Sequence, residues 1–430
     1  MLSETRGVPA AAPRNHAAFG VMTPDRAEAR AALASGSFAA LVERRASPRP
    51  VRQGVRCHPL LRAARPGIRE DVADLGTAVD KLVEAATSDA KGKTLQRAVS
   101  AVVGAFDDAP AKEAKKALQR LDGALESASG HASQVLHLTL GALVEGGASP
   151  ELAWPAIARG LQEALDGATT FALACAEAAR SQHLETALAK AGAKTAKKMP
   201  EAAAAWEALP ARCLAGVACL TRSAKVRADA RKRALYDLAY PLEDAVAEVG
   251  FLAQALRVLD DEELLVLHPD LGRGFRVVVS EIAHNGELFA VLSHALVGDP
   301  KKGGLPGKRL DRRAMAALTG DGKPPSDVEL VAPFHFVTWT GLRSDGSLPP
   351  AEEVLDHAIS PDAVPADIPA RAGVRIILLQ APSEALHLPD ERMFDGLSPS
   401  ARVVKQLTPA AVKKTLVELG RAARRTKRGG

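Results

Sequence analysis

The residues of this sequence that could do chemistry gather in two predicted strands and in the turn beside one of them. A histidine titrates near neutral pH, a carboxylate accepts protons, and an arginine binds anionic groups. Loops carried on a rigid sheet often hold functional sites, so the turn HPDLGRG is where we expect ligand binding. The alternative is an ordinary turn with a solvated charge pair. The candidate ligand-binding residues are His268, Asp270, Arg273, Arg276, His335 and Trp339, and the catalytic residues stay unknown.

Two Glu-x-x-His pairs have a spacing that metal ligands use. On a helix this spacing puts both side chains on one face, as di-iron sites require. Glu281 of the first pair falls on a predicted strand, however, where His284 three positions later points to the opposite face. The second pair, Glu384 and His387, lies between two prolines. We therefore predict no metal site.

The remaining motifs predict no cofactor. None of the patterns HExxH, GxSxG and GxGxxG occurs in the sequence, so the common signatures of zinc proteases, hydrolases and dinucleotide enzymes are missing. Gly307-Lys308 fails as a phosphate-binding loop, because Lys302 stands where that motif needs its first glycine. The four cysteines are Cys57, Cys175, Cys213 and Cys219. They form no CxxC pair, and we expect them to be structural thiols.

The elements that position the candidate turn are two predicted antiparallel strands, 263–268 and 275–282. Phe275, Val277 and Val279 alternate with more polar residues, which is typical of a sheet covered on one face. The stretch after the second strand has two interpretations. Asn285-Gly286 is a strong hairpin signal, whereas the apolar residues of 288–296 recur at helical spacing. We favour a helix over 286–297.

Further strands and a last helix complete the second half of the chain. Residues 330–340 read as a strand whose phenylalanines form an aromatic cluster around Trp339. Residues 374–379 form a continuous apolar run, which is typical of a buried central strand. Thr408-Pro409 begins a helix whose Val412, Leu416 and Leu419 we expect to face inward.

The first half is predicted to be helical almost throughout. Aromatic residues make up only 3% of the chain while hydrophobic residues reach 47%, so the core must consist mostly of alanine, leucine and valine. We expect an exposed loop at 190–200, which carries four lysines, and we expect Pro241 to kink its helix or split it in two. The predicted fold class is α+β: an all-helical bundle or irregular solenoid over 71–260, followed over 261–419 by a small, mainly antiparallel sheet with flanking helices.

Both ends of the chain are basic, although the net charge is only +5. Residues 1–70 hold 12 Arg, no Lys and 5 acids, and their many prolines predict a poorly ordered arm. Residues 401–430 hold nine Lys and Arg against the single acid Glu418. We predict a disordered basic tail over 420–430, and its candidate contacts to a polyanion are Arg424, Arg425, Lys427 and Arg428.

Three functions are compatible with this pattern. The leading hypothesis is a non-catalytic protein-interaction or adaptor protein with a protein partner, because no catalytic signature is present. The second is an enzyme of unknown class with its site in residues 261–400. The third is nonspecific association with nucleic acid through the basic termini. No apolar run is long enough to predict a membrane span, and we expect a cytoplasmic location.

Overall fold

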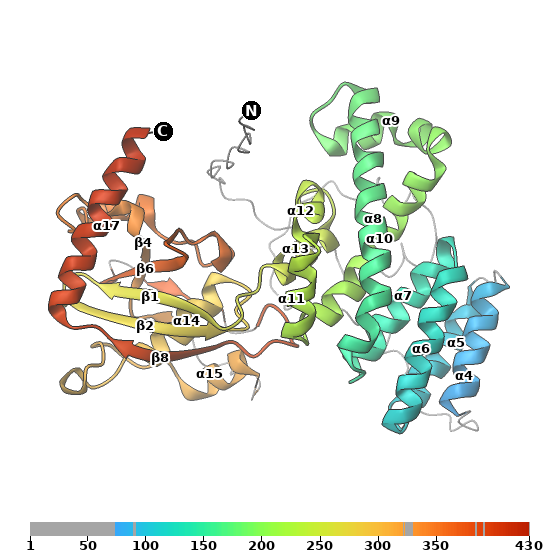
Figure 1. Cartoon of the computed structure of the whole chain (residues 1–430), viewed down its shortest axis with the longest axis horizontal. Coiled ribbons are helices and arrows are strands. Elements are labelled where there is room, and N and C mark those ends of the chain that lie inside the picture. The colour runs from blue at the N-terminus through green and yellow to red at the C-terminus, as the bar shows by residue number, and fades with distance from the viewer. Residues whose placement is uncertain are drawn as a thin grey trace, which may run out of the picture. The chain divides into compact units, whose positions relative to one another are not determined.

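The computed structural model describes residues 74–88, 92–320, 322, 330–382, 385–389 and 392–429. The predicted arm over 1–70, with Cys57, lies outside the described residues. The fold is α+β, as the sequence predicts: helices come first, and a mixed sheet of several strands follows (Figure 1).

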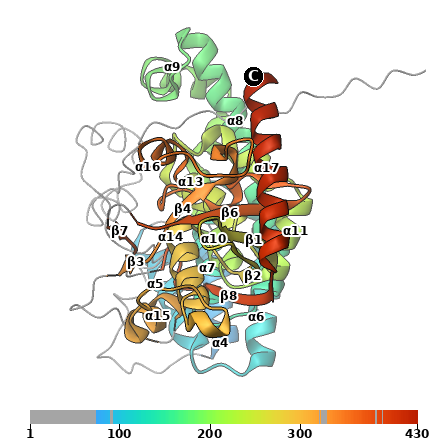
Figure 2. The same cartoon turned by 90° about the vertical axis from the view of Figure 1, so that its left-hand side faces the viewer.

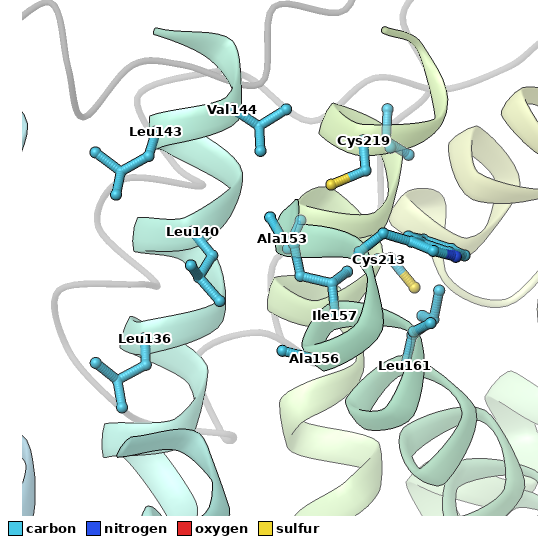
Figure 3. Packing of buried hydrophobic residues seen from close by; sticks show 14 of the residues in the cluster. Leu136, Leu140, Leu143, Val144, Ala153, Ala156, Ile157, Leu161, Cys213 and Cys219 are labelled. Atoms are coloured by element: carbon cyan, nitrogen blue, oxygen red, sulfur yellow. The ribbon is translucent and has the colours of Figure 1, made fainter. Parts of the chain in front are cut away.

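The helices of the first half pack through small residues. Gly141 lets α7 approach α10 so closely that a Cβ there would lie 2.9 Å from Ala215 Cα. Figure 3 shows leucines of α7 beside Ile157 of α8, with Cys213 and Cys219 of α10 in the same core. The helices and the short 3-10 turn η1 are α4 (Leu75–Thr87), α5 (Lys93–Phe106), α6 (Ala111–Ser127), α7 (Gly130–Glu145), α8 (Pro150–Ala179), α9 (Leu184–Lys198), α10 (Pro200–Leu220), α11 (Ala224–Lys232), α12 (Leu235–Ala239), η1 (Tyr240–Leu242) and α13 (Ala247–Leu256).

Two features of this half differ from, or refine, the sequence prediction. The loop expected at 190–200 is wrong, because α9 continues to Lys198 and α10 begins at Pro200. Lysine and alanine are good helix formers, and lysines in a last turn complement the helix dipole. Of the two outcomes expected at Pro241, the structure has the split, with α12 before the 3-10 turn η1 and α13 after it. Within the described ranges α10 alone is long and apolar enough to cross a bilayer, and it packs against α7, α8 and α13.

The main sheet has the strand order β4-β6-β1-β2-β8, with β5 paired to β6. The predicted hairpin is confirmed, since β1 and β2 pair antiparallel from Glu262–Val279 to His268–Arg273. The predicted buried strand is confirmed as β6, which lies between β4 and β1 and runs parallel to β1. The strands are β1 (Glu262–His268), β2 (Arg273–Ser280), β3 (Val331–Ala332), β4 (His335–Thr338), β5 (Ala370–Arg371), β6 (Val374–Gln380), β7 (Leu386–His387) and β8 (Ser400–Gln406).

Each face of the sheet carries a helix. Phe275, Val277 and Val279 of β2 are buried in one cluster with α14 (Asn285–Leu296), which confirms the helical interpretation of that stretch. The other face packs Leu267 of β1 against α17 (Pro409–Gly429), whose inward residues include Val412, as predicted. Figure 2, in which the left-hand side of Figure 1 faces the viewer, shows α14 and α17 beside the strands. The smaller elements are η2 (Pro300–Lys302), α15 (Arg312–Thr319), η3 (Trp339–Gly341), α16 (Ala351–Val354), η4 (Leu355–His357) and η5 (Pro365–Asp367).

Two expectations about the second half differ from the structure. The predicted strand over 330–340 is broken into β3, β4 and η3. The aromatic cluster expected around Trp339 is wrong: Phe336 stacks on Phe289 of α14 at 3.9 Å, whereas Trp339 lies in the cluster beside α17. Strand alternation explains this, because neighbouring residues point to opposite faces. Residues 420–429, predicted as a disordered tail, belong to the helix α17.

A buried ion network joins the helices to the sheet. The Arg227 side chain on α11 is 0% exposed, and its Nε donates to Asp260 Oδ2 at 2.9 Å. Arg227 also donates to the Leu220 carbonyl at 2.6 Å and lies 3.3 Å from Glu281 Oε1. Arg231 donates to the same Asp260 carboxylate. This network fixes the point where the chain leaves α13 and enters β1.

Candidate functional site

Three of the six predicted site residues gather at the turn between β1 and β2. His268 ends β1, is buried, and meets Phe334 edge-on with ring centroids 5.8 Å apart. Burial lowers the pKa of His268, and the nearby charge of Asp270 opposes that shift. Arg273 lies opposite His268 in the strand register, and its Nη2 donates to the Pro300 carbonyl at 3.0 Å. The turn is thus a packed connection with its arginine already engaged.

The other three predicted residues lie elsewhere on the sheet. Arg276 stands in mid-strand and pairs with Glu263 of β1 at 2.6 Å. His335 precedes Phe336 in β4 and therefore points to the face opposite Phe336. Trp339 donates from Nε1 to the Pro369 carbonyl at 3.0 Å. The structure therefore does not bring the six residues into one constellation.

The Glu-x-x-His residues have structural partners. Glu281 accepts a hydrogen bond from the Ser398 amide at 2.8 Å in addition to its contact with Arg227. His284 caps α14, because its Nδ1 accepts from the Gly286 amide at 3.0 Å. Glu384 lies outside the described residues. Across the part of the chain that the structure describes, no three His, Cys, Asp or Glu side chains form a group that could hold a metal ion.

The strand β8, most of whose residues are exposed, was not predicted from the sequence. It is the last strand of the main sheet, paired with β2 on one side, and no other strand among the described residues pairs with its outer side. Six of its seven residues are exposed, including Val403 at 38% and Val404 at 40%. A register shift beside Arg276 and Val277 marks a bulge in the pairing. Two adjacent valines between Pro399 and Pro409 were the available sequence signal.

The opposite edge of the sheet is covered. The Ile359 amide donates to the Phe336 carbonyl of β4 at 2.8 Å, and Val337 forms a bridge with Ala358. Proteins commonly protect sheet edges by covering them in this way. Of the two edge strands, β4 is therefore covered, whereas β8 is accessible.

The segment that leads into β8 is anchored firmly. Phe394 and Leu397 are buried in the helical core, and a Cβ on Gly396 would lie 2.9 Å from the Thr221 carbonyl. The Met393 amide donates to the buried carboxylate of Glu287 at 2.8 Å. These contacts hold the beginning of β8 in place before its exposed residues start.

The end of β8 is held as well. The Leu407 amide donates to the Gly274 carbonyl at 2.8 Å, and Gln406 Nε2 donates to the Gly303 carbonyl at 3.2 Å. The second bond ties β8 to a glycine-rich turn that carries Lys301 and Lys302, both exposed. β8 is thus a preformed strand held at both ends, with a row of backbone groups facing outward.

The surface around β8 is basic. Arg402 and Lys405 are exposed on the strand itself, and the strand contains no acidic residue. Lys301 and Lys302 extend the positive charge past its end, because Gln406 holds their turn there. We refer to these four residues, Arg402, Lys405, Lys301 and Lys302, together with the outer backbone of β8, as the β8 edge.

Comparison with known proteins adds no relative to this picture. A scan against protein-family models finds no match, and searches of curated proteins and of solved structures find none either.

Proposed function

We propose that this chain is a non-catalytic protein-interaction protein, an adaptor in which a helical half supports a sheet that binds a partner along β8. The observation that carries the proposal is the open β8 edge. An edge strand presents unpaired amide and carbonyl groups at regular spacing, and an extended peptide can add to it as a further strand. Main-chain hydrogen bonds then supply affinity, while the side chains beside the strand supply specificity.

The anchoring of β8 favours binding at this edge. A strand that is already held in its bound conformation loses little conformational entropy when a partner adds to it. The bulge and the two basic residues also match the devices by which proteins prevent unwanted edge-to-edge pairing. An edge strand with these features resists pairing with other copies of itself and can still pair with a complementary segment.

The placement of the candidate site residues supports binding over catalysis. His268 is packed against Phe334, and Arg273 and Arg276 already have partners. His335 lies on the face of β4 opposite that of Phe336, away from His268 and Arg273. An enzyme needs its acid, base and charge-stabilising groups within reach of one reacting atom.

Site-specific cross-linking tests the proposal. Val404→benzoylphenylalanine places a photoreactive group on the β8 edge of the full chain, expressed in its native cells. Val331→benzoylphenylalanine is the matched control, because Val331 has a similar exposure, 38%, on the separate strand β3. We expect a discrete cross-linked protein from position 404 and not from position 331. Equal or absent cross-linking at the two positions would refute a binding role for this edge.

A second candidate function, association with nucleic acid, has one observation in its favour. The outer face of α17 exposes Lys413, Lys414, Arg421, Arg424 and Arg425, with Glu418 as its acid. The side chains of Lys427 and Arg428 lie outside the described residues. Retention on a polyanion that falls steeply with salt, and that is lost in an R421E/R424E/R425E variant, would support this function. Retention unchanged in that variant would refute it.

A further inference from the structure

We propose that the β8 edge binds an acidic, extended segment of a partner protein, in which carboxylates alternate with apolar residues and which adds to the sheet as the strand after β8. This inference rests on the proposed function and specifies the chemistry of the partner. The segment would lie beside Ser400–Gln406, with its backbone paired to β8 and its carboxylates near the basic residues of the β8 edge.

The positive charge of the β8 edge determines the sign of the charge that a partner segment carries. Arg402 and Lys405 stand three residues apart on β8, and Lys301 and Lys302 follow at its end. β2, the strand paired with β8, contains no acidic residue, and Glu263 of β1 is already paired with Arg276. Asp299, beside the lysine turn, accepts the Lys301 amide as a cap. Even with Asp299 counted, the β8 edge has four basic residues against one acid, and complementary potentials attract an acidic segment and exclude a basic one.

The same charge argues against two other occupants. The N-terminal residues 1–70 of this chain have a balance of +7, from 12 Arg and 5 acids, so they would be repelled. A second copy of the chain would pair β8 with β8 and bring the Arg402 and Lys405 side chains of both copies close together. Like charges on facing strands are destabilising. A separate acidic partner is the occupant that the charges favour.

The two valines indicate the apolar part of the partner. Val403 and Val404 are 38% and 40% exposed in the middle of a strand whose ends are held. Cross-strand pairs of β-branched residues stabilise a sheet. Apolar residues of an added strand would cover these valines while its carboxylates meet the basic residues on either side.

Binding of defined peptides by the full chain tests the inference. The probe is a fluorescent peptide of about nine residues, long enough to match a typical strand, in which glutamate and valine alternate. Three comparison ligands are the same peptide with lysine in place of glutamate, the same peptide N-methylated at every residue, and a single-stranded oligonucleotide of equal charge. The test variant is R402E/K405E. Its matched control is K194E/K197E, which makes the same charge change on exposed residues of α9.

We expect the acidic peptide to bind the wild type and the α9 control equally, and the R402E/K405E variant at least about tenfold more weakly. The N-methylated peptide, which lacks amide donors on both edges, should bind about tenfold more weakly as well, because strand addition needs those donors. Equal binding by the N-methylated peptide would overturn strand addition, and equal binding by R402E/K405E would overturn the site. If the oligonucleotide binds more tightly than the acidic peptide, and R402E/K405E weakens its binding, the β8 edge is a nucleic-acid site instead.

The two proposals fail in different ways. If position 404 cross-links a partner whose captured segment is neutral or basic, the acidic chemistry is wrong while the interaction function stands. If position 404 captures no protein, the interaction function itself fails, whatever the peptides do.

Discussion

Protonation of one buried histidine should destabilise the helical half of this protein. His137 on α7 is 3% exposed, and its Nδ1 lies 2.7 Å from the Ser133 carbonyl. Because a carbonyl only accepts, Nδ1 carries the proton of the neutral ring. Its Nε2 faces α8 so closely that a Cβ on Gly160 would lie 2.2 Å away, and it has no hydrogen-bond partner among the described residues. A second proton on Nε2 would have no acceptor.

The pKa of His137 gives the size of the effect. Burial, with a smaller contribution from the neighbouring charge of Arg212, lowers this pKa from 6.5 to about 4, and the hydrogen bond to Ser133 partly opposes the change. One pKa unit corresponds to about 1.4 kcal/mol, so this lowering is worth about 3 kcal/mol. Since the folded-state pKa lies below the unfolded one, this stability is fully present above pH 6.5. It is lost as the pH falls towards 4, and about 2 kcal/mol of it is lost by pH 5.

Urea unfolding of the full chain, followed by the helical signal between pH 7 and pH 5, measures this loss. We expect the wild type to lose about 2 kcal/mol more than His137→Met over that range, because methionine does not titrate. His137→Gln provides a second non-titrating variant if the methionine packs poorly against Gly160. His131→Met is the control, since His131 is exposed on the same helix. A loss of the same size in the wild type and in both His137 variants would refute the reasoning.

Three further predictions concern buried groups. Arg227→Met should lower the free energy of unfolding by about 3–5 kcal/mol, because Asp260 loses its main partner, and Asp260→Asn in the same chain should recover part of that loss in denaturation experiments. Glu287→Ala should cost about 2–3 kcal/mol, measured in the same way, since the amides of Ala283, His284 and Met393 would lose their acceptor; a loss below about 0.5 kcal/mol would contradict this. Burial raises the pKa of the Cys219 thiol to about 12, so a thiol reagent at pH 8 should leave Cys219 unmodified in the native chain and modify it in urea, as read by mass spectrometry.

Individual strands and helices could be predicted where the spacing of apolar residues agrees with the turn and capping residues. The β1–β2 hairpin follows from alternation on both sides of a Pro/Gly turn, and the structure has it in that register. The sequence from Asn285 onwards was compatible with both a hairpin and a helix. His284 and Glu287 form a reciprocal capping box there, which fixes the helix. The sequence pattern did not reveal this cap, because histidine is not among the usual capping residues.

The candidate site could be predicted less well, because its accessibility depends on which parts of the chain pack over each strand and turn. The turn with His268 carries reactive residue types, yet packing against Phe334 and bonding to Pro300 occupy it. β8 carries no histidine or carboxylate that would have singled it out, yet it is left exposed at the end of the sheet. Whether a strand lies at an edge follows from pairing across the sheet, such as β1 with β6 more than 100 residues later, and local patterns do not contain that information.

The segment before β8 has a consequence for how the protein is made. Phe394 and Leu397 fill part of a core built by helices that begin at Leu75. Chains emerge from the ribosome N-terminus first, so the helices are synthesised long before the two side chains that complete their packing. During translation the nascent helical half has an unfilled apolar site, which is closed only when the last tenth of the chain arrives. A nascent chain stalled before Phe394 would therefore be a natural substrate for chaperones.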